Sequence, residues 1–318
     1  MVHAMEYVKD KVNTISEWGE FPDSRPVEDL IPRSLVVIDK PQGPTSHQVS
    51  AWVRDIFDEK TGHSGTLDPK VTGVLPMGIG RSVRLLDLLH SVPKEYVAAM
   101  KFHGAVKNRQ LDQILKEFEG EIYQTPPLRA GVKRQRRKRK IYEIEKLDFK
   151  GRDALLRIRC ESGTYIRTLC KDLGKTLGTG GHMMELRRVE AGSFTEDDMI
   201  ILQDLRDAYE FYRDGGGDKL KEVLMPYERA LAVFPQMRIK DTAAGAVLNG
   251  ADLAAPGILE MEKFLKDEQV ALISMKGEGI AVGRALYDVE EIVDMEEGIV
   301  FRSERVFSPS GDYPKRWK

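Results

Sequence analysis

The sequence has no long apolar run and no leader-like beginning. No stretch of its 318 residues approaches the roughly 20 apolar residues that a membrane span needs, so we expect no membrane segment. Residues 1–6 lack the basic-then-apolar order of a signal peptide. Both observations favour a cytoplasmic protein.

Cysteine is also scarce. Only Cys160 and Cys170 occur, and they do not form a C-x-x-C pair. Two thiols without histidines nearby cannot supply the four ligands of a structural zinc site. No metal signature such as H-E-x-x-H is present either. We expect two buried thiols and no metal site.

The net charge is only −2, so the charge balance does not indicate a nucleic-acid partner. The charges are nevertheless unevenly spread, because residues 133–140 form a basic run. Its cations are Lys133, Arg134, Arg136, Arg137, Lys138, Arg139 and Lys140. Such a run indicates contact with a polyanion, and a solvated loop or a targeting signal explains it equally well.

The length is sufficient for two domains. Prolines interrupt residues 1–33 and predict an irregular N-terminal arm. Residues 34–234 mix helical and strand periods, which predicts an α+β domain. From residue 235 to residue 318, short apolar runs separated by glycines predict a small, mostly-β domain.

Several elements of the larger domain can be placed from the apolar pattern. Residues 35–38 predict a buried strand, and Thr45 or Ser46 is expected to cap the helix that follows. The predicted core face of this helix comprises Val49, Trp52, Val53, Ile56 and Phe57. The glycine-rich residues 60–80 predict a long packed loop, and a helix is expected at 82–90.

Strands are predicted at residues 96–102 and 156–160, the second from its alternation of apolar and basic side chains. A helix is expected after the second strand, and Gly178 is expected to end it. Its predicted apolar face comprises Ile166, Leu169, Cys170, Leu173 and Leu177.

Asp68 and Arg167 are the candidate functional residues on local grounds. Asp68 precedes Pro69, which biases its backbone toward a turn, so it is either a turn cap or a functional carboxylate. Arg167 is expected in the first turn of a helix, where the helix dipole disfavours a cation. Pairing with a carboxylate such as Asp68 would explain it, and a solvated side chain would do so equally well.

Five ordered motifs resemble the TruB family of pseudouridine synthases. They are DKPQGPTS at 39–46, GHSGTLDPKVTGVL at 62–75, KEY at 94–96, GTYIRTL at 163–169 and LRR at 186–188. The resemblance implies a pseudouridine synthase fold, with a mixed, mainly antiparallel sheet flanked by helices. It also implies an isomerase that converts uridine in RNA to pseudouridine without a metal or organic cofactor, acting on a base flipped out of its stack.

The same resemblance assigns roles to individual residues. It implies that Asp68 is the nucleophile, attacking either C1′ of the ribose or C6 of the base. Tyr96 would stack on the base and take a proton late in the reaction, and Arg167 would pair with Asp68 and keep it ionised. The implied substrate-binding residues are His63 near the base, Tyr165 in the pocket and Leu186 in its wall.

Three departures from the bacterial tRNA enzymes point to one branch of the family. Residues 105–110 lack the usual Thr/Asp-rich segment, the stretch after residue 129 is strongly basic, and an N-terminal arm is present. Residues 237–308 also resemble a PUA domain, on which the arm is packed in similar proteins. The chain therefore resembles the archaeal dyskerin-like catalytic subunits of box H/ACA ribonucleoproteins.

This closer resemblance implies several partners. A guide RNA would select the uridine in rRNA or tRNA, and the PUA domain would hold the ACA end of the guide. The protein partners would be a small zinc-ribbon-like protein, a Gar-type β-barrel protein and a kink-turn-binding ribosomal protein. The basic run would hold phosphates near the substrate. Two alternatives remain: a stand-alone tRNA pseudouridine synthase, and a non-catalytic RNA-binding scaffold.

Overall fold

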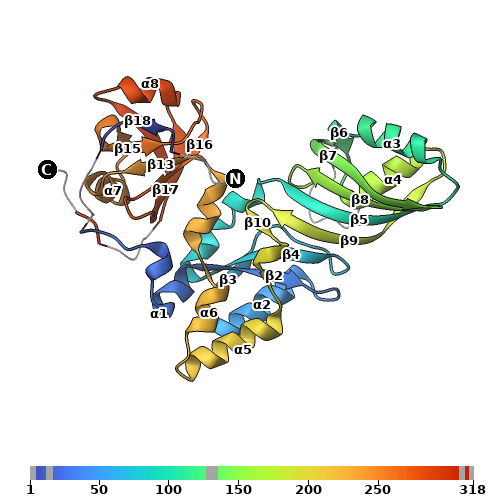
Figure 1. The fold of residues 1–318 in the computed structure, drawn as a ribbon, viewed down its shortest axis with the longest axis horizontal. Helices are drawn as coiled ribbons and strands as arrows, with labels where there is room; N and C mark the ends of the chain where they lie inside the picture. The colour runs from blue at the N-terminus through green and yellow to red at the C-terminus, as the bar shows by residue number, and fades with distance from the viewer. Residues whose placement is uncertain (1–4, 12–16, 127–134, 308–311, 315–318) are drawn as a thin grey trace. The chain divides into compact units, whose positions relative to one another are not determined.

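The computed structural model describes residues 5–11, 17–126, 135–307 and 312–314. The chain divides into two compact units (Figure 1). Unit 1 comprises residues 1–34 and 225–318, and unit 2 comprises residues 35–224. Residues 225–234 thus group with unit 1, whereas the sequence predicts them at the end of the preceding domain. Within the described residues, no helix has both the length and the apolar character needed to cross a membrane.

Unit 2 is built on a mixed, mainly antiparallel sheet with the strand order β11-β2-β4-β9-β5-β8-β7-β6, and the predicted fold class is confirmed. Its strands are β2 Ser34–Lys40, β3 Thr61–His63, β4 Thr72–Ile79, β5 Lys94–Phe102, β6 Gly120–Gln124, β7 Arg137–Lys150, β8 Asp153–Cys160, β9 Gly181–Ala191, β10 Phe194–Thr195 and β11 Met199–Ile200. Its helices are α2 Ser46–Phe57, α3 Asn108–Glu117, α4 Ile166–Thr176, α5 Leu202–Arg213 and α6 Asp218–Val223, with the short 3-10 helices η3 Gly80–Leu85, η4 Leu88–His90 and η5 Glu196–Asp198.

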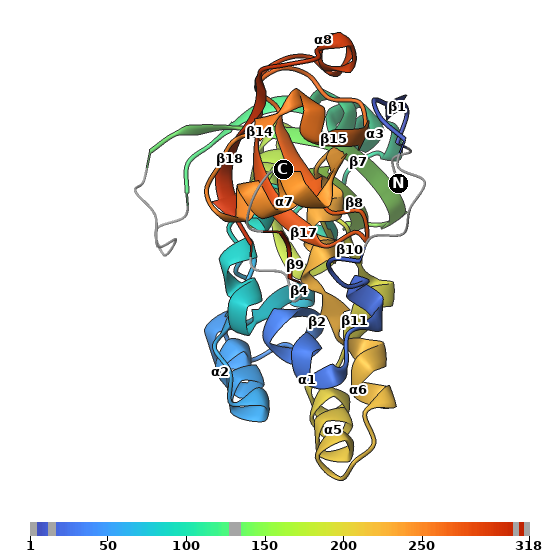
Figure 2. The same ribbon diagram turned by 90° about the vertical axis from the view of Figure 1, so that its left-hand side faces the viewer.

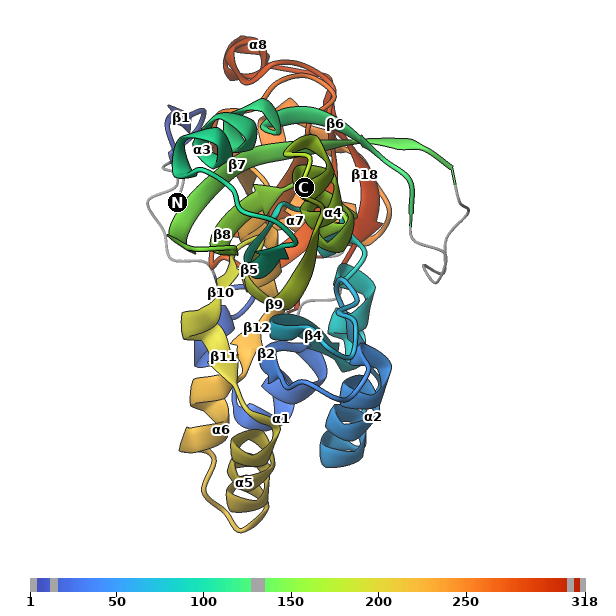
Figure 3. The same ribbon diagram turned by 90° about the vertical axis from the view of Figure 1, so that its right-hand side faces the viewer.

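Helices α3 and α4 cover one face of the β5, β8 and β7 part of this sheet (Figure 3). Burial alternates strictly along β8, which confirms the strand predicted from the alternation in residues 156–160. In α4 the predicted face is buried from Ile166 to Leu173, and Gly178 follows the helix with a φ of +71°. Both cysteines lie buried in this core, as predicted, and burial raises the pKa of each thiol to about 12.

Helix α2 begins with a capping box. The Thr45 hydroxyl accepts a hydrogen bond from the Gln48 backbone N–H, and the Gln48 side-chain oxygen accepts one from the Thr45 backbone N–H. The predicted core positions Val49, Val53 and Phe57 are buried. Trp52 is 46% exposed, so its assignment to the core is wrong. Fewer residues of α2 are buried than its apolar pattern suggests, and Trp52 lies outside the buried face.

Residues 60–80 are not one long loop, which corrects the sequence prediction. They contain β3 and β4, and β4 is buried between β2 and β9. Gly73 and Pro76 lie within β4 and conceal the strand, because both residues are rare inside sheets. The helix predicted at 82–90 is instead the pair of 3-10 helices η3 and η4.

Unit 1 is built on a second sheet, with the strand order β1-β15-β13-β16-β17-β18-β14. Its strands are β1 Tyr7–Val8, β13 Gln236–Ile239, β14 Leu253–Ala254, β15 Ile258–Met261, β16 Gln269–Ile273, β17 Gly279–Ala285 and β18 Ile299–Val306, and the short strand β12 Met225–Pro226 also belongs to this unit. Its helices are α1 Val27–Leu30, α7 Asp241–Leu248 and α8 Val289–Asp294, with the 3-10 helices η1 Pro22–Ser24, η2 Ile31–Arg33, η6 Tyr227–Val233 and η7 Ala255–Gly257. Figure 2 shows α7 against β14, β17 and β18.

The N-terminal segment is built into unit 1. Strand β1 extends the sheet by pairing with β15. The Arg25 guanidinium is fully buried and lies 2.7 Å from the Glu228 carboxylate and 3.1 Å from that of Glu278. Glu278 also accepts a 2.6 Å hydrogen bond from the Tyr313 hydroxyl. Residues from the beginning, middle and end of this unit thus meet in one buried charged cluster.

This cluster predicts a large effect of Arg25→Met on stability. Removing the guanidinium leaves the buried Glu278 carboxylate without its cation, so the free energy of unfolding should fall by about 3–5 kcal/mol. Urea denaturation monitored by circular dichroism measures this change. The control is Arg54→Met, which removes an exposed pair with Asp55 and should cost less than about 1 kcal/mol. Equal, small losses in the two variants would contradict the prediction.

Candidate active site

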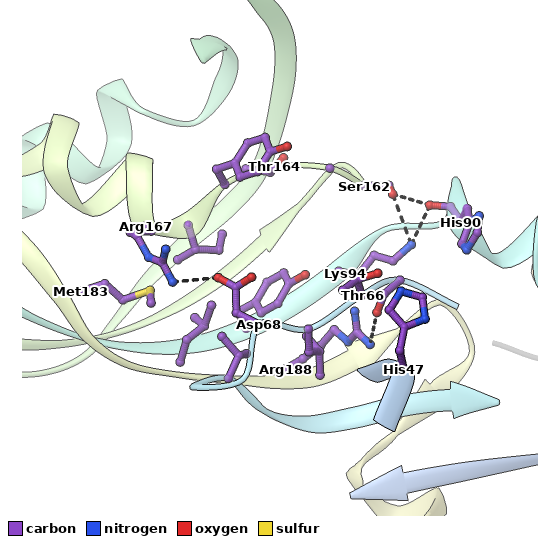
Figure 4. Close-up of a pocket in the computed structure, with 18 residues that line it drawn as sticks. His47, Thr66, Asp68, His90, Lys94, Ser162, Thr164, Arg167, Met183 and Arg188 are labelled. Atoms are coloured by element: carbon purple, nitrogen blue, oxygen red, sulfur yellow. Dashed lines mark hydrogen bonds and ion pairs between the residues drawn. The ribbon is translucent and has the colours of Figure 1, made fainter. Parts of the chain in front are cut away.

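An open pocket of about 870 Å³ lies in unit 2 (Figure 4). The β3–β4 loop, β5, the turn before α4 and β9 all contribute to its lining. The polar side chains that line it are His47, Thr66, Asp68, His90, Lys94, Tyr96, Ser162, Thr164, Tyr165, Arg167 and Arg188. Elements far apart in the sequence therefore present polar groups to a common space, as expected of an active site.

Asp68 and Arg167 meet in this pocket. The Arg167 Nη2 donates a hydrogen bond of 2.7 Å to Asp68 Oδ2, across 99 positions of sequence (Figure 4). The pairing expected from the sequence is therefore present. Asp68 does form a turn through its backbone, since its carbonyl accepts from the Val71 N–H at 2.9 Å. Its carboxylate points to Arg167.

This ion pair adds little to the stability of the fold. The side chains remain 46% exposed for Arg167 and 58% exposed for Asp68, and exposed pairs contribute about 0–1 kcal/mol. Stability is therefore a poor reason for the arrangement. The guanidinium next to the carboxylate instead orients its oxygens. An oriented carboxylate at the surface of a pocket is suited to act as a nucleophile.

Buried hydrogen bonds hold the loop that carries Asp68. Ser46, at the start of α2, donates to the Leu67 carbonyl and accepts from the Leu67 N–H at 3.1 and 2.9 Å. On the other side of Asp68, the Pro69 carbonyl accepts from the Gly43 N–H at 2.8 Å. The fully buried Lys40 ammonium donates to the Val71 carbonyl at 2.9 Å. The carboxylate thus projects from a loop fixed on both sides.

The start of α4 is held in a similar way. Tyr165 is its N-cap residue, and no side chain caps the helix there. Gln124 of β6, which is only 2% exposed, bonds both backbone groups of Tyr165 at 2.9 and 3.1 Å. This contact fixes Arg167 two residues later, in the first helical turn.

Tyr96 lies on β5 directly opposite Arg188 of β9. Arg188 is 1% exposed and donates to the Val74 carbonyl at 2.7 Å and to the Gly65 carbonyl at 3.0 Å. Burial raises the pKa of Tyr96, while the charge of Arg188 and a hydrogen bond from it act in the opposite direction. Arg188 thus contacts two of the elements that line the pocket.

Lys94 is a second buried cation at the pocket. Its ammonium donates to the carbonyls of Leu89, His90 and Val92 at 3.0, 2.9 and 2.7 Å. Figure 4 shows the bond to His90. Burial and the like charge of Arg188 lower the pKa of Lys94 to about 8. Since three carbonyls surround it, Lys94 holds the η4 turn against β5.

His63 is the predicted site residue that does not line the pocket. It lies in β3, and its ring stands 5.0 Å from the ring of His47, which does line the pocket. Burial lowers the pKa of His63 to about 4, with further contributions from nearby His47 and Arg188. His63 is therefore neutral at pH 7. The other predicted side chains, Tyr96, Tyr165 and Leu186, line the pocket together with Asp68 and Arg167.

The sequence matches several families of RNA-modifying proteins. Residues 54–109 match the TruB family pseudouridylate synthase N-terminal domain, and residues 167–232 match the tRNA pseudouridylate synthase B C-terminal domain. Residues 82–190 match the Pus10 C-terminal family. Residues 235–307 match the PUA domain, and residues 3–50 match the DKCLD (NUC011) domain.

Full-length relatives agree with these matches. A probable tRNA pseudouridine synthase B of Archaeoglobus fulgidus is 48% identical over 98% of this chain and 97% of that protein. The protein of the same name from Methanocaldococcus jannaschii is 47% identical, covering 98% of this chain and 94% of its own length. The chain belongs to the TruB family of pseudouridylate synthases. It is a pseudouridine synthase, as predicted.

Two solved structures are similar to this TruB-family chain over nearly its whole length. A chain of a Cbf5-Nop10-Gar1 complex is 44% identical, with a TM-score of 0.90, and the match covers 95% of this chain and 94% of that one. A chain of an H/ACA RNP bound to a substrate RNA containing 2′-deoxyuridine is 43% identical, also with a TM-score of 0.90. This match covers 98% of this chain and 96% of that one. The predicted branch of the TruB family is confirmed.

The basic run of this TruB-family enzyme is partly described. Lys133 and Arg134 lie outside the described residues, and residues 137–140 begin strand β7. Arg139 donates to the Gly163 carbonyl at 3.1 Å, next to the pocket. Lys138 pairs with Glu121 at 2.6 Å, so part of the run is already engaged within the protein. Its binding of RNA stays a prediction.

Sequence reasoning missed the buried polar residues behind the site, namely Lys40, Lys94, Gln124 and Arg188. Two of them could have been found from the strand period. Lys94 precedes Tyr96 by two positions and Arg188 follows Leu186 by two, so each shares a strand face with a predicted pocket residue. Among the described residues, no group of three or more His, Cys, Asp or Glu side chains could hold a metal ion.

Proposed function

We propose that this chain isomerises uridine to pseudouridine in RNA as the catalytic subunit of an archaeal box H/ACA ribonucleoprotein. The observation that carries the proposal is the likeness, at a TM-score of 0.90 and 44% identity, to a chain of the Cbf5-Nop10-Gar1 complex. The match covers both units, including the N-terminal segment and the PUA domain. A guide RNA then selects the target uridine in rRNA or tRNA.

The pocket supports a specific division of roles. A flipped uridine enters the space between Asp68 and Tyr96, and the Asp68 carboxylate attacks either C1′ of the ribose or C6 of the base. The N1–C1′ bond breaks, uracil turns, and a C5–C1′ bond replaces it, while the bond between Asp68 and the substrate breaks and returns the free carboxylate. Tyr96 stacks on the base and accepts the proton that leaves C5, while N1 gains one, so the reaction is an isomerisation. Arg167 holds the Asp68 carboxylate in a fixed orientation.

The same likeness supports the partners. We propose that proteins of the Nop10 and Gar1 kind, a zinc-ribbon-like protein and a Gar-type β-barrel, assemble on this chain together with the guide RNA. The PUA domain holds the ACA end of the guide, and the basic run holds phosphates near the pocket. The kink-turn-binding ribosomal protein and the cytoplasmic location stay predictions from the sequence.

A second candidate function is stand-alone modification of tRNA. The names of the relatives from Archaeoglobus fulgidus and Methanocaldococcus jannaschii, probable tRNA pseudouridine synthase B, favour it. Both functions use the same pocket and the same chemistry. They differ in whether an RNA guide is required.

The first prediction from the proposed function concerns Asp68→Asn. The amide preserves the shape of the side chain but is not a carboxylate nucleophile, so pseudouridine formation should fall by at least about 1,000-fold. Pseudouridine is measured by release of tritium from C5-labelled uridine, and RNA affinity by gel shift should stay near that of the unchanged protein. The control is Asp55→Asn, an exposed carboxylate on α2 that does not line the pocket. Retained activity in Asp68→Asn would remove the proposed nucleophile.

The second prediction concerns Arg167→Ala. Without its partner the Asp68 carboxylate loses orientation, and the rate of pseudouridine formation should fall by on the order of 100-fold. Arg167→Lys keeps the charge but not the geometry of the guanidinium, so it should retain more activity than Arg167→Ala. Single-turnover assays at saturating enzyme separate this effect from RNA binding. A near-normal rate in Arg167→Ala would show that the ion pair has no catalytic role.

The third prediction distinguishes the two candidate functions. The pure protein is assayed on a guide-matched rRNA fragment and on tRNA, alone and with guide RNA plus proteins of the Nop10 and Gar1 kind. We expect the rRNA fragment to be modified only with the guide and partners, at a uridine that moves when the guide sequence is changed. Equal turnover of tRNA with and without the guide and partners, and none of the rRNA fragment, would favour the stand-alone enzyme.

A further inference from the structure

Arg188 is an unusual residue in unit 2. It is a cation at 1% exposure on β9, and no carboxylate among the described residues forms an ion pair with it. A buried guanidinium without a counter-charge is costly to desolvate, so hydrogen bonds must compensate for the water that it loses. Burial accordingly lowers the pKa of Arg188. The contacts of Arg188 should therefore explain why a cation is buried at this position.

Those contacts reach β4, the loop before it and β5. The Nε donates to the Val74 carbonyl of β4 at 2.7 Å. The Nη2 donates to the Gly65 carbonyl at 3.0 Å (Figure 4). Gly65 lies three residues before Asp68 in the same loop. Tyr96 is the cross-strand partner of Arg188 on β5, and the charge of Arg188 acts on the pKa of Tyr96. A single guanidinium thus holds the loop of the nucleophile and lies beside the residue that stacks on the base.

Gly65 shows how closely the guanidinium fits this loop. Its φ is +77°, a conformation that side chains other than glycine rarely adopt. A Cβ at this position would lie 3.0 Å from Arg188 Nη1. The loop therefore reaches its place only because a glycine stands opposite the guanidinium.

We propose that Arg188 is a positioning residue for the isomerisation, holding the Gly65–Asp68 loop and Tyr96 in a fixed relation at the pocket. This inference rests on the proposed function. The planar guanidinium suits the task, because its donors point in fixed directions toward separate acceptors. Lysine offers one ammonium on a flexible stem and cannot reproduce that geometry.

The charge of Arg188 has a second consequence, for the proton transfer. The titratable or charged groups around Tyr96 are Arg188 from β9, Cys160 from β8, Lys94 on its own strand, and Asp68 and Arg167 across the pocket. Burial raises the pKa of Tyr96, and Arg188 opposes that rise. A tyrosine that accepts a proton must first be deprotonated, so the rate rises as Tyr96 loses its proton. Removing the Arg188 charge should therefore move this ascending limb of the pH–rate profile to higher pH.

Arg188→Met and Arg188→Lys test the proposal, with Arg187→Met as the matched control. Arg187 is the neighbouring residue on β9, pairs with Asp39 and Glu196, and does not line the pocket. Each variant is assayed in the assembled complex by steady-state tritium release at several substrate concentrations between pH 6 and pH 10. Circular dichroism and thermal melting report whether each protein is folded.

We expect Arg188→Met to lose on the order of 100-fold in rate at pH 7 and to recover part of it at higher pH. Arg188→Lys should lose about 10-fold in kcat with little change in KM. Because it keeps the charge, the ascending limb of its pH–rate profile should stay where it is in the unchanged protein. Arg187→Met should have the same rate and the same pH–rate profile as the unchanged protein. A loss in Arg188→Met by the same factor at every pH, or an unchanged kcat in Arg188→Lys, would overturn the proposal.

Two further outcomes are also decisive. If Arg188→Met does not fold, the kcat of Arg188→Lys alone tests the proposal, since that variant keeps the buried charge and changes only the geometry of the donors. If the unchanged protein forms no pseudouridine in any assembly, the proposed function fails. If it is active and Asp68→Asn is not, while both Arg188 variants behave as the unchanged protein, the inference about Arg188 alone fails.

Discussion

The short parallel contact between β4 and β9 is the constraint on which the site of unit 2 depends. It joins the two halves of the sheet through the pairs Thr72–Arg187 and Gly73–Arg188. At Gly73 the φ is +102°, and a Cβ would lie 2.1 Å from the Arg188 carbonyl oxygen. Only glycine permits this approach. Because β4 follows the Asp68 loop directly, the same contact determines how far that loop lies from Tyr96 on β5.

The electrostatics of the pocket follow from the arrangement of its cations. Among the described residues, Asp68 is the one carboxylate that lines the pocket, and Arg167, Lys94 and Arg188 line it with positive charge. Arg167 is half exposed and pairs with Asp68 directly, whereas Lys94 and Arg188 are buried and bind backbone carbonyls. Burial, with a smaller contribution from the like charge of Arg188, lowers the pKa of Lys94 to about 8. The fold tolerates this repulsion because carbonyls replace the lost water.

The sequence predicted the chemistry of this site better than its architecture. Asp68, Arg167 and Tyr96 could be named because they lie in ordered motifs, and α4 and β8 because their apolar periods are regular. Strand β4 was hidden by Gly73 and Pro76, whose place in a sheet depends on neighbours that local sequence does not reveal. The strand period places Arg188 on the pocket face of β9, but its contacts and those of Gln124 were out of reach, since each bonds a carbonyl more than 40 positions away. Burial without a counter-charge cannot be inferred from residue type.

The Arg25 cluster has a consequence for the order in which the protein is made. Arg25 and its partner Glu278 are 253 positions apart, and all of unit 2 lies between them. At translation rates of about 5–20 residues per second, Arg25 is synthesised roughly 13–50 s before Glu278. Unit 2 is complete by residue 224 and can fold during that interval. The segment that carries Arg25 therefore stays without this second carboxylate until Glu278 has been synthesised, and the buried cluster can close only then.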